Sequence, residues 1–281
     1  MPILWSIIVS VGCVFAVLGI WVWARSRSKR RSPGTDKLLR SPGHSVALQL
    51  EEIQECLSTW LVFLIFAPPF LFAVFAHQPF PAWVFLPLGG GYGFALYSFF
   101  KLITKSSNYR LGLMGERAVG EELNQLMLDG FRVFHDFPAD EKWNIDHVLV
   151  GSQGVYVVET KARRKQQGPA GQQDHVVIYN GQTLKFPHCE DRHGLEQAVR
   201  NARWLSNYLG SATGEPVSVR PILTFPGWYV ELETKDTAVR VLNPKQIRKV
   251  ISKNDPPNQL SPEKMQRIIH QLEQKCRDVE W

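Results

Sequence analysis

The sequence contains few cysteines, and they show no pairing pattern. Only four of the 281 residues are cysteine (Cys13, Cys56, Cys189 and Cys276), and their spacing fits neither a disulfide framework nor a CxxC metal motif. Because only two of them follow residue 104, a four-cysteine iron–sulfur cluster in the C-terminal part is excluded within one chain. The chain is also long enough to form a sizeable core, which excludes a mini-protein that depends on disulfides.

Charge is scarce as well, and it is unevenly distributed. Charged residues make up 21% of the chain and hydrophobic residues 44%, a balance that excludes wholesale disorder. Residues 1–104 carry eight basic and four acidic side chains, whereas residues 105–281 carry 24 basic and 22 acidic ones. The net charge of +6 therefore comes mostly from the N-terminal third, and it is poor evidence that the C-terminal part binds nucleic acid.

Three apolar runs lie in the first 104 residues, at about 3–23, 60–76 and 82–100. About 20 apolar residues suffice to cross a bilayer as a helix. None of the runs has an interior Asp, Glu, Lys or Arg, and such intramembrane charges are what mark transport and proton pathways. We therefore predict that residues 1–104 form a membrane anchor of three helices rather than a transporter or a channel.

The basic residues predict how this anchor is oriented. Arg25 to Arg31 follow the first run, the reverse of the order in a signal peptide, and Lys101 and Lys105 follow the third run. By the positive-inside rule the N-terminus lies outside, residues 24–57 form a basic cytoplasmic loop, and the C-terminal domain is cytoplasmic. We expect the bacterial inner membrane. Gly89 and Gly93 have GxxxG spacing, which favours association between helices, although the alternative is a locally flexible helix.

Residues 105–281 have the composition of a separate α/β domain, divided from the anchor by a break near residues 105–110. Short β-branched or aromatic runs bounded by turn residues predict strands, and apolar residues at helical spacing predict helices. Their order indicates a central sheet flanked by helices, which we expect to fold on its own. The predicted helices are 114–128, 195–209, 245–251 and 262–277, and the predicted strands are 131–134, 145–150, 155–158, 175–179, 183–186, 217–225 and 239–242.

The segment from Trp143 to Lys161 holds the side chains best suited to chemistry. Strand alternation places Glu159 and Lys161 on one face, at the end of a strand that is otherwise apolar. A tight turn at residues 151–154 predicts a hairpin, which can bring Asp146 beside Glu159. Two carboxylates with an adjacent lysine suit Mg²⁺ or Mn²⁺, and such an ion can activate water against a phosphodiester. The alternative is a surface ion pair between Glu159 and Lys161, worth at most about 1 kcal/mol.

The spacing Asp-x(12)-Glu-x-Lys resembles the core of the PD-(D/E)xK nuclease superfamily. The wider context is similar to the nuclease-related domain (NERD) family over roughly residues 111–225. The motifs that carry this resemblance are Gly112–Glu116, Gly130–Asp136, Asn144–Gly151, Gly154–Lys161 and Leu195–Asn201. Two positions depart from the family pattern. Ile145 stands where the family has proline, and His193-Gly194 stand where it often has Asn-Pro.

The resemblance implies a restriction-endonuclease-like core, a mixed sheet flanked by helices, preceded here by the membrane helices. It implies catalytic roles for Glu116, Asp146, Glu159, Lys161 and Gln197, with Asp146, Glu159 and Glu116 as ligands of Mg²⁺ or Mn²⁺. The first functional hypothesis is therefore a membrane-anchored, metal-dependent nuclease that acts on nucleic acid, with DNA as the expected substrate. The alternative is a membrane-tethered scaffold that holds nucleic acid or a partner without cutting it.

Other polar residues have simpler interpretations. We expect His147 to face away from Asp146 and to be a packed or hydrogen-bonded histidine rather than a ligand. The segment His188–His193 lacks a second pair of ligands at zinc spacing and is interpreted as a polar loop. The basic run at residues 161–165 either contacts phosphates or forms a solvated loop.

Overall fold

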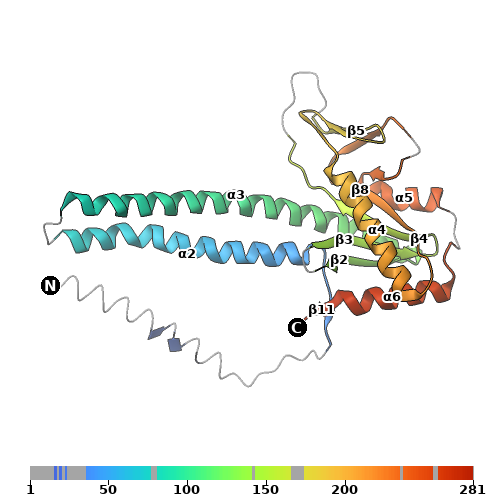
Figure 1. Cartoon of the computed structure of the whole chain (residues 1–281), viewed down its shortest axis with the longest axis horizontal. Helices are drawn as coiled ribbons and strands as arrows, with labels where there is room; N and C mark the ends of the chain where they lie inside the picture. Colours follow the sequence, from blue (N-terminus) through green and yellow to red (C-terminus); the bar gives the residue numbers. More distant parts are fainter. Residues whose placement is uncertain are drawn as a thin grey trace. The chain divides into compact units, whose positions relative to one another are not determined.

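The computed structural model describes residues 16–17, 19–20, 23, 36–76, 81–140, 143–165, 174–234, 237–255 and 259–280. The chain divides into two compact units, which are described one at a time (Figure 1). The helical unit contains Glu55–Ile103. The C-terminal unit contains Lys37–Gln54 together with Thr104–Glu280. The two long helices, α2 (His44–Phe75) and α3 (Phe85–Asn124), each contribute residues to both units.

The helical unit contains most of α2, the short helix η1 (Ala82–Val84) and the first half of α3. Among the described residues, α2 is the one helix that is long and apolar enough to cross a membrane. The first predicted run, 3–23, lies almost wholly outside the described residues, and the third lies in η1 and α3. The described structure therefore contains one candidate membrane helix rather than the three that we expected.

Two consecutive prolines lie inside α2 without ending it. Pro68 has no backbone N–H, so the carbonyl of Leu64, four residues earlier, lacks its usual helical donor. The hydroxyl of Tyr92 in α3 donates a hydrogen bond to this carbonyl at 3.2 Å. A neighbouring helix thus satisfies the freed backbone group, as an apolar environment requires.

The helix boundaries correct two predictions. Residues 44–57, expected in a basic loop, are helical from His44 onward, because no glycine or proline interrupts them and Ala, Leu, Gln and Glu dominate. The division expected near residues 105–110 lies close to the boundary between the units at Thr104, but the helix does not break there. Helix α3 continues to Asn124, and residues 105–110 lack glycine and proline. The helices predicted at 82–100 and 114–128 are thus largely one helix.

The C-terminal unit is built on a five-stranded mixed sheet in the order β10-β8-β4-β3-β2. Strand β4 pairs antiparallel with β3 and parallel with β8, and β8 pairs parallel with β10. The strands span Arg132–Asp140 (β2), Trp143–Gly151 (β3), Gly154–Thr160 (β4), Val219–Thr224 (β8) and Arg240–Leu242 (β10). This arrangement confirms the predicted α/β class and its mixed central sheet.

Helices cover both faces of this sheet (Figure 1). Val155 and Val157 of β4 pack with α4 (His193–Thr213) and α6 (Pro262–Cys276) on one face. Tyr156 and Val158 point to the other face, where α3 and α5 (Pro244–Asn254) pack. Strand β4 is buried along its whole length, which explains its almost continuous apolar sequence.

A second sheet of four short strands has the order β7-β6-β5-β9. Strands β5 (Val176–Tyr179) and β6 (Leu184–Phe186) form the hairpin predicted around Asn180-Gly181. The Asn180 side chain accepts hydrogen bonds from two backbone N–H groups of the turn, and Gly181 has a φ of 92°. The remaining strands, β7 (Cys189–Asp191) and β9 (Tyr229–Leu232), were not predicted. The expected polar loop 188–193 is therefore partly an edge strand.

The segment Lys37–Gln54, which we call the strap, belongs to the C-terminal unit although it precedes the apolar part of α2. Its strand β1 (Leu38–Leu39) pairs antiparallel with β11 (Arg277–Val279) at the end of the chain. Arg40 follows β1, and its Nε and Nη2 donate to the Asp278 carboxylate at 2.9 and 2.6 Å. The domain predicted at 105–281 therefore packs with an N-terminal segment that the sequence analysis assigned to the anchor.

Candidate functional site

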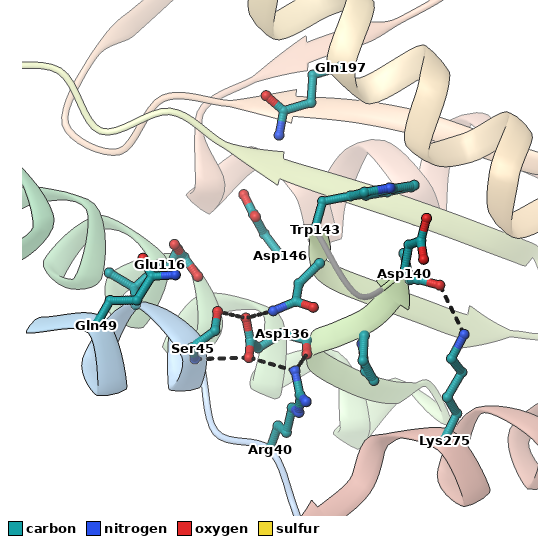
Figure 2. A pocket seen from close by; sticks show the side chains of 14 residues that line it. Arg40, Ser45, Gln49, Glu116, Asp136, Asp140, Trp143, Asp146, Gln197 and Lys275 are labelled. Carbon is teal, nitrogen blue, oxygen red and sulfur yellow. Dashed lines mark hydrogen bonds and ion pairs between the residues drawn. The ribbon is translucent and has the colours of Figure 1, made fainter. Parts of the chain in front are cut away.

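One pocket of about 810 Å³ brings together strap, strand and helix residues of the C-terminal unit. Figure 2 shows the carboxylates of Glu116 and Asp146 directed into the same space, with Gln197 of α4 across from them. Glu116 lies in α3 and Asp146 in β3. The lining consists of Arg40, Ser45, Val46, Gln49, Glu116, Asp136, Pro138, Ala139, Asp140, Trp143, Asn144, Asp146, Gln197 and Lys275.

The β3–β4 hairpin determines where the two strand carboxylates lie. His147 pairs with Val158, and one further step in this register places Asp146 opposite Glu159. The backbone N–H of Thr160 donates to Asp146 Oδ2 at 2.7 Å. The hairpin expected from the tight turn is therefore present, and it brings the two carboxylates to neighbouring positions.

Glu159 and Lys161 form an ion pair in which the carboxylate is buried and the lysine is partly exposed, rather than a pair on the open surface. Glu159 is 1% exposed, and its Oε1 lies 2.9 Å from Lys161 Nζ. Helix α4 supplies a partner for each, because Asn201 Nδ2 donates to Glu159 Oε2 at 2.9 Å and Lys161 Nζ donates to Gln197 Oε1 at 2.8 Å. Gln197 and Asn201 are one helical turn apart, so one face of α4 contacts both charged groups.

The second glycine of the Gly-x-x-Gly-Glu motif explains how Glu116 reaches the site. A Cβ on Gly115 would lie 2.5 Å from the Cβ of Ala162, the residue that follows Lys161. The absence of a side chain at Gly115 therefore permits α3 to pack directly against the end of the β4 segment. Gly112 has no atom within 4 Å of such a Cβ, so the first glycine makes no comparable contact.

We expect Gly115→Ala to destabilise the C-terminal unit by about 1–3 kcal/mol, because the added methyl must push α3 away from Ala162. Chemical denaturation of the full chain in detergent measures this change. Gly112→Ala is the matched control, and it should be neutral or more stable by up to about 1 kcal/mol, because alanine favours helix. Equal stabilities of the two variants would contradict the close approach.

Burial raises the pKa values of all three carboxyls, and neighbouring acidic groups raise those of Glu116 and Asp146 further. Desolvation, with Asp136 and Glu159 nearby, raises the pKa of Glu116 to about 8. The pKa of Asp146 is well above its usual range, because of burial and then the charges of Glu159 and Glu116. The pKa of Glu159 is raised by burial, although Lys161 opposes the shift. Each of these carboxyls therefore retains its proton to a higher pH than the same group in water.

The raised pKa of Glu116 predicts how stability depends on pH. Because the pKa of Glu116 rises from 4.5 to about 8 on folding, its favourable contribution is complete below about pH 4.5 and is lost as the pH rises through about 8. Without divalent ions the melting temperature of the C-terminal unit should therefore fall between pH 5 and 8.5. Glu116→Gln should reduce this fall, whereas Glu121→Gln, an exposed residue of the same helix, should not. Addition of Mg²⁺ at pH 8 should restore stability in the parent protein.

The residues present fit a divalent cation by their chemistry. No three His, Cys, Asp or Glu side chains within the described ranges already lie together as a metal-binding group. However, Asp146, Glu159 and Glu116 offer the hard oxygen ligands that Mg²⁺ prefers. Burial is the main cause of their raised pKa values, with repulsion between acidic groups added at Glu116 and Asp146, and a bound cation would favour the charged form of each. Asn201 Oδ1 is in addition buried without a hydrogen-bond partner beside Glu159.

Asp136 and the strap residues are members of the pocket that the sequence analysis missed. Asp136 is 2% exposed and has a φ of 47°, which is unusual for a residue other than glycine. Its carboxylate accepts from Ser45 N and Oγ at 3.0 and 2.6 Å, from Arg40 Nη1 at 3.2 Å and from Asn144 Nδ2 at 3.3 Å (Figure 2). A charged residue among the apolar residues of β2 was a usable signal for Asp136, whereas no local pattern pointed to Arg40.

The remaining polar residues behave largely as expected. His147 is fully buried, and its ring nitrogens lie 2.9 Å from His135 Nδ1 and 3.3 Å from Thr160 Oγ1, which confirms a hydrogen-bonded core histidine. Burial lowers the pKa values of both histidines, so both are neutral near pH 7. In the basic run, Arg163 pairs with Asp191 and Arg164 donates to Ser107. Those two arginines are therefore engaged within the protein.

Comparison with known proteins gives one match. Residues 111–226 match the family described as Nuclease-related domain (NERD), which confirms the domain predicted from the motifs at roughly 111–225. The matched range includes all five predicted site residues and less than half of the chain. No curated protein and no solved structure matched the sequence.

Proposed function

We propose, on the premise that residues 111–226 are a nuclease-related domain, that this protein is a metal-dependent nuclease held at the cytoplasmic face of a membrane. One observation carries the proposal: Lys161 contacts both Glu159 and Gln197, and Gln197 lines the same pocket as Asp146 and Glu116. All five residues thus converge at one end of the sheet, from four separate parts of the sequence.

The five residues would have different roles in the reaction. Gln197 and Glu159 hold the Lys161 side-chain nitrogen at 2.8 and 2.9 Å. In this place the ammonium form of Lys161 can orient an attacking water, and only the neutral amine form can take a proton from it. Asp146, Glu159 and Glu116 would hold Mg²⁺ or Mn²⁺. When bound, this ion supplies a Lewis acid that neutralises charge on a phosphodiester. Hydrolysis joins the water oxygen to phosphorus and releases a sugar oxygen as an alcohol.

The test is cleavage of a nucleic-acid panel by the full chain in detergent, with Mg²⁺, Mn²⁺ or a chelator present. We expect cleavage that requires the metal, with DNA among the substrates. The panel includes single-stranded and duplex DNA and RNA. If the protein cuts none of them and calorimetry detects no binding of Mg²⁺ or Mn²⁺, the non-cutting scaffold is the better explanation.

We further propose that the apolar runs anchor the protein in the bacterial inner membrane as three helices. Many large apolar side chains of α2 and of the first half of α3 are exposed, among them Phe66 (64%), Phe72 (76%) and Leu86 (80%). Contact with lipid would remove these side chains from water.

The charge order predicts that a reporter fused after Trp281 is cytoplasmic and that one fused after Gln78 is external. Activity of enzymatic reporters that work on only one side of the membrane measures both positions in cells. A fusion after Gly34 serves as the internal comparison and should report the cytoplasmic side. An external C-terminus would contradict the proposed access to intracellular nucleic acid.

A further inference from the structure

Three aromatic side chains form a continuous group beside the proposed cleavage site. Trp143 at the start of β3 meets Trp204 of α4 edge to face, with ring centroids 5.5 Å apart and an interplanar angle of 76°. Trp204 stacks on Tyr208 at 5.4 Å and 6°. All three side chains are half-buried at the rim of the core. We call Trp143, Trp204 and Tyr208 the aromatic shelf.

Two cations lie against the rings of the shelf. Lys275 Nζ of α6 is 4.7 Å from the ring centroid of Trp204 and 4.8 Å from that of Tyr208. The guanidinium of Arg200 is 5.6 Å from the centroid of Trp143. Positive charge combined with aromatic faces is the arrangement that holds single-stranded nucleic acid, because bases stack on the rings while cations attract the phosphates.

Trp143 is the residue of the shelf that lines the pocket containing the carboxylates. Lys275, Glu116 and Asp146 line the same pocket, and Figure 2 shows the indole of Trp143 extending toward Asp140. Trp143 precedes Asp146 by three residues in β3, which corresponds to roughly 10 Å along the strand. A base on Trp143 would therefore lie within one or two nucleotides of a phosphodiester at Asp146.

We propose that the aromatic shelf binds an unpaired nucleobase next to the cleaved phosphodiester, so that the substrate is single-stranded nucleic acid or an unpaired end. In a duplex both faces of each base are covered by its neighbours, and a side chain reaches a base face only where the base has left the stack. Cleavage at this position rests on the proposed nuclease function. The binding of a base does not, because it requires neither the metal nor Lys161.

The test measures binding without cleavage. The full chain in detergent and a chelator is titrated against end-labelled oligothymidylate, oligouridylate and a duplex of equal length, and fluorescence anisotropy reports the dissociation constant. We expect tighter binding of single strands than of the duplex. Trp143→Ala should weaken single-strand binding about 5- to 100-fold, the equivalent of one lost stacking contact. Trp143→Phe should retain most of the affinity, and Tyr229→Ala, which removes an exposed aromatic side chain outside the pocket, should retain all of it.

A scan of abasic positions along the strand gives a second measurement that does not depend on the folding of a variant. In the parent protein, removal of one particular base should weaken binding by the same factor as Trp143→Ala does. In the Trp143→Ala variant, removal of that base should leave the affinity unchanged. Three results would contradict the proposed binding of an unpaired base by the aromatic shelf. They are equal affinity for duplex and single strand, an abasic scan with no sensitive position, and no binding of any strand. Single-strand binding without any metal-dependent cleavage would support the shelf and contradict the proposed nuclease. Metal-dependent cleavage with no preference for unpaired bases would support the proposed nuclease and contradict the proposed role of the shelf.

Discussion

Asp146→Asn should reduce metal-dependent cleavage by about 100-fold or more while the protein remains folded. Neutralising one carboxylate removes a ligand and a charge that would hold the ion against the phosphodiester. The new amide oxygen can still accept the hydrogen bond from Thr160 N, and the repulsion with Glu159 and Glu116 is relieved. Cleavage rate, calorimetric Mg²⁺ affinity and melting temperature together separate a lost ligand from a lost fold.

Glu159→Gln should reduce cleavage about as much as Asp146→Asn, but it should lower the stability of the folded protein more. Glu159 accepts from Lys161 and Asn201, and a glutamine would direct an NH₂ group at one of these two donors. Lys161→Ala should stop cleavage yet leave Mg²⁺ binding intact or tighter, because a neighbouring cation is removed. Glu121→Gln is the control and should be close to neutral. If Asp146→Asn and Glu159→Gln both cut as well as the parent, the assignment of the site is wrong.

Arg40→Ala should cause the largest loss of stability among single changes in the strap. Arg40 is 17% exposed and joins Asp136, which is 3% exposed, to the half-exposed Asp278. Removing one partner of a buried charge costs about 3–5 kcal/mol, and we expect the lower end of this range because Asp278 can regain water and Ser45 still donates to Asp136. Urea denaturation of the full chain in detergent gives the value.

The matched control is Arg132→Ala, because Arg132 and Glu273 form an exposed pair at 2.6 Å that also joins the first half of the unit to its C-terminal helix. Such pairs contribute at most about 1 kcal/mol. Two variants of equal stability would mean that the strap is not part of the cooperative unit. A fragment of residues 105–281, which we first expected to fold on its own, lacks β1 and Arg40 and should therefore be less stable than one that begins at Lys37.

Local periodicity was sufficient to predict the hairpin of β3 and β4 and the face shared by Glu159 and Lys161. Alternation of side chains fixes which residues point together, and a two-residue turn fixes the register between strands. Similarity to the family motifs added Glu116 and Gln197. Both are far from the hairpin in sequence, so local periodicity could not predict that they lie near it.

The strap could not be predicted, because its contacts depend on packing between distant segments. Arg40 and Asp136 are 96 residues apart, and neither belongs to a periodic pattern that includes the other. The continuity of α3 was missed for a different reason. The change from apolar to polar composition near residue 105 resembles a domain boundary, whereas a helix needs only residues that tolerate its backbone, and none of residues 101–111 is glycine or proline.

The pairing of β1 with β11 also has a consequence for synthesis of the protein. Arg40 leaves the ribosome 238 residues before Asp278, a delay of roughly 10–50 s at ordinary rates of translation. During that time Arg40 lacks one of its two acidic partners, and β1 has no strand with which to pair. A polypeptide interrupted before Arg277 would carry every proposed catalytic side chain but would lack the strand that pairs with β1 beside the pocket. The strap can therefore take its full set of contacts only after β11 has been synthesised.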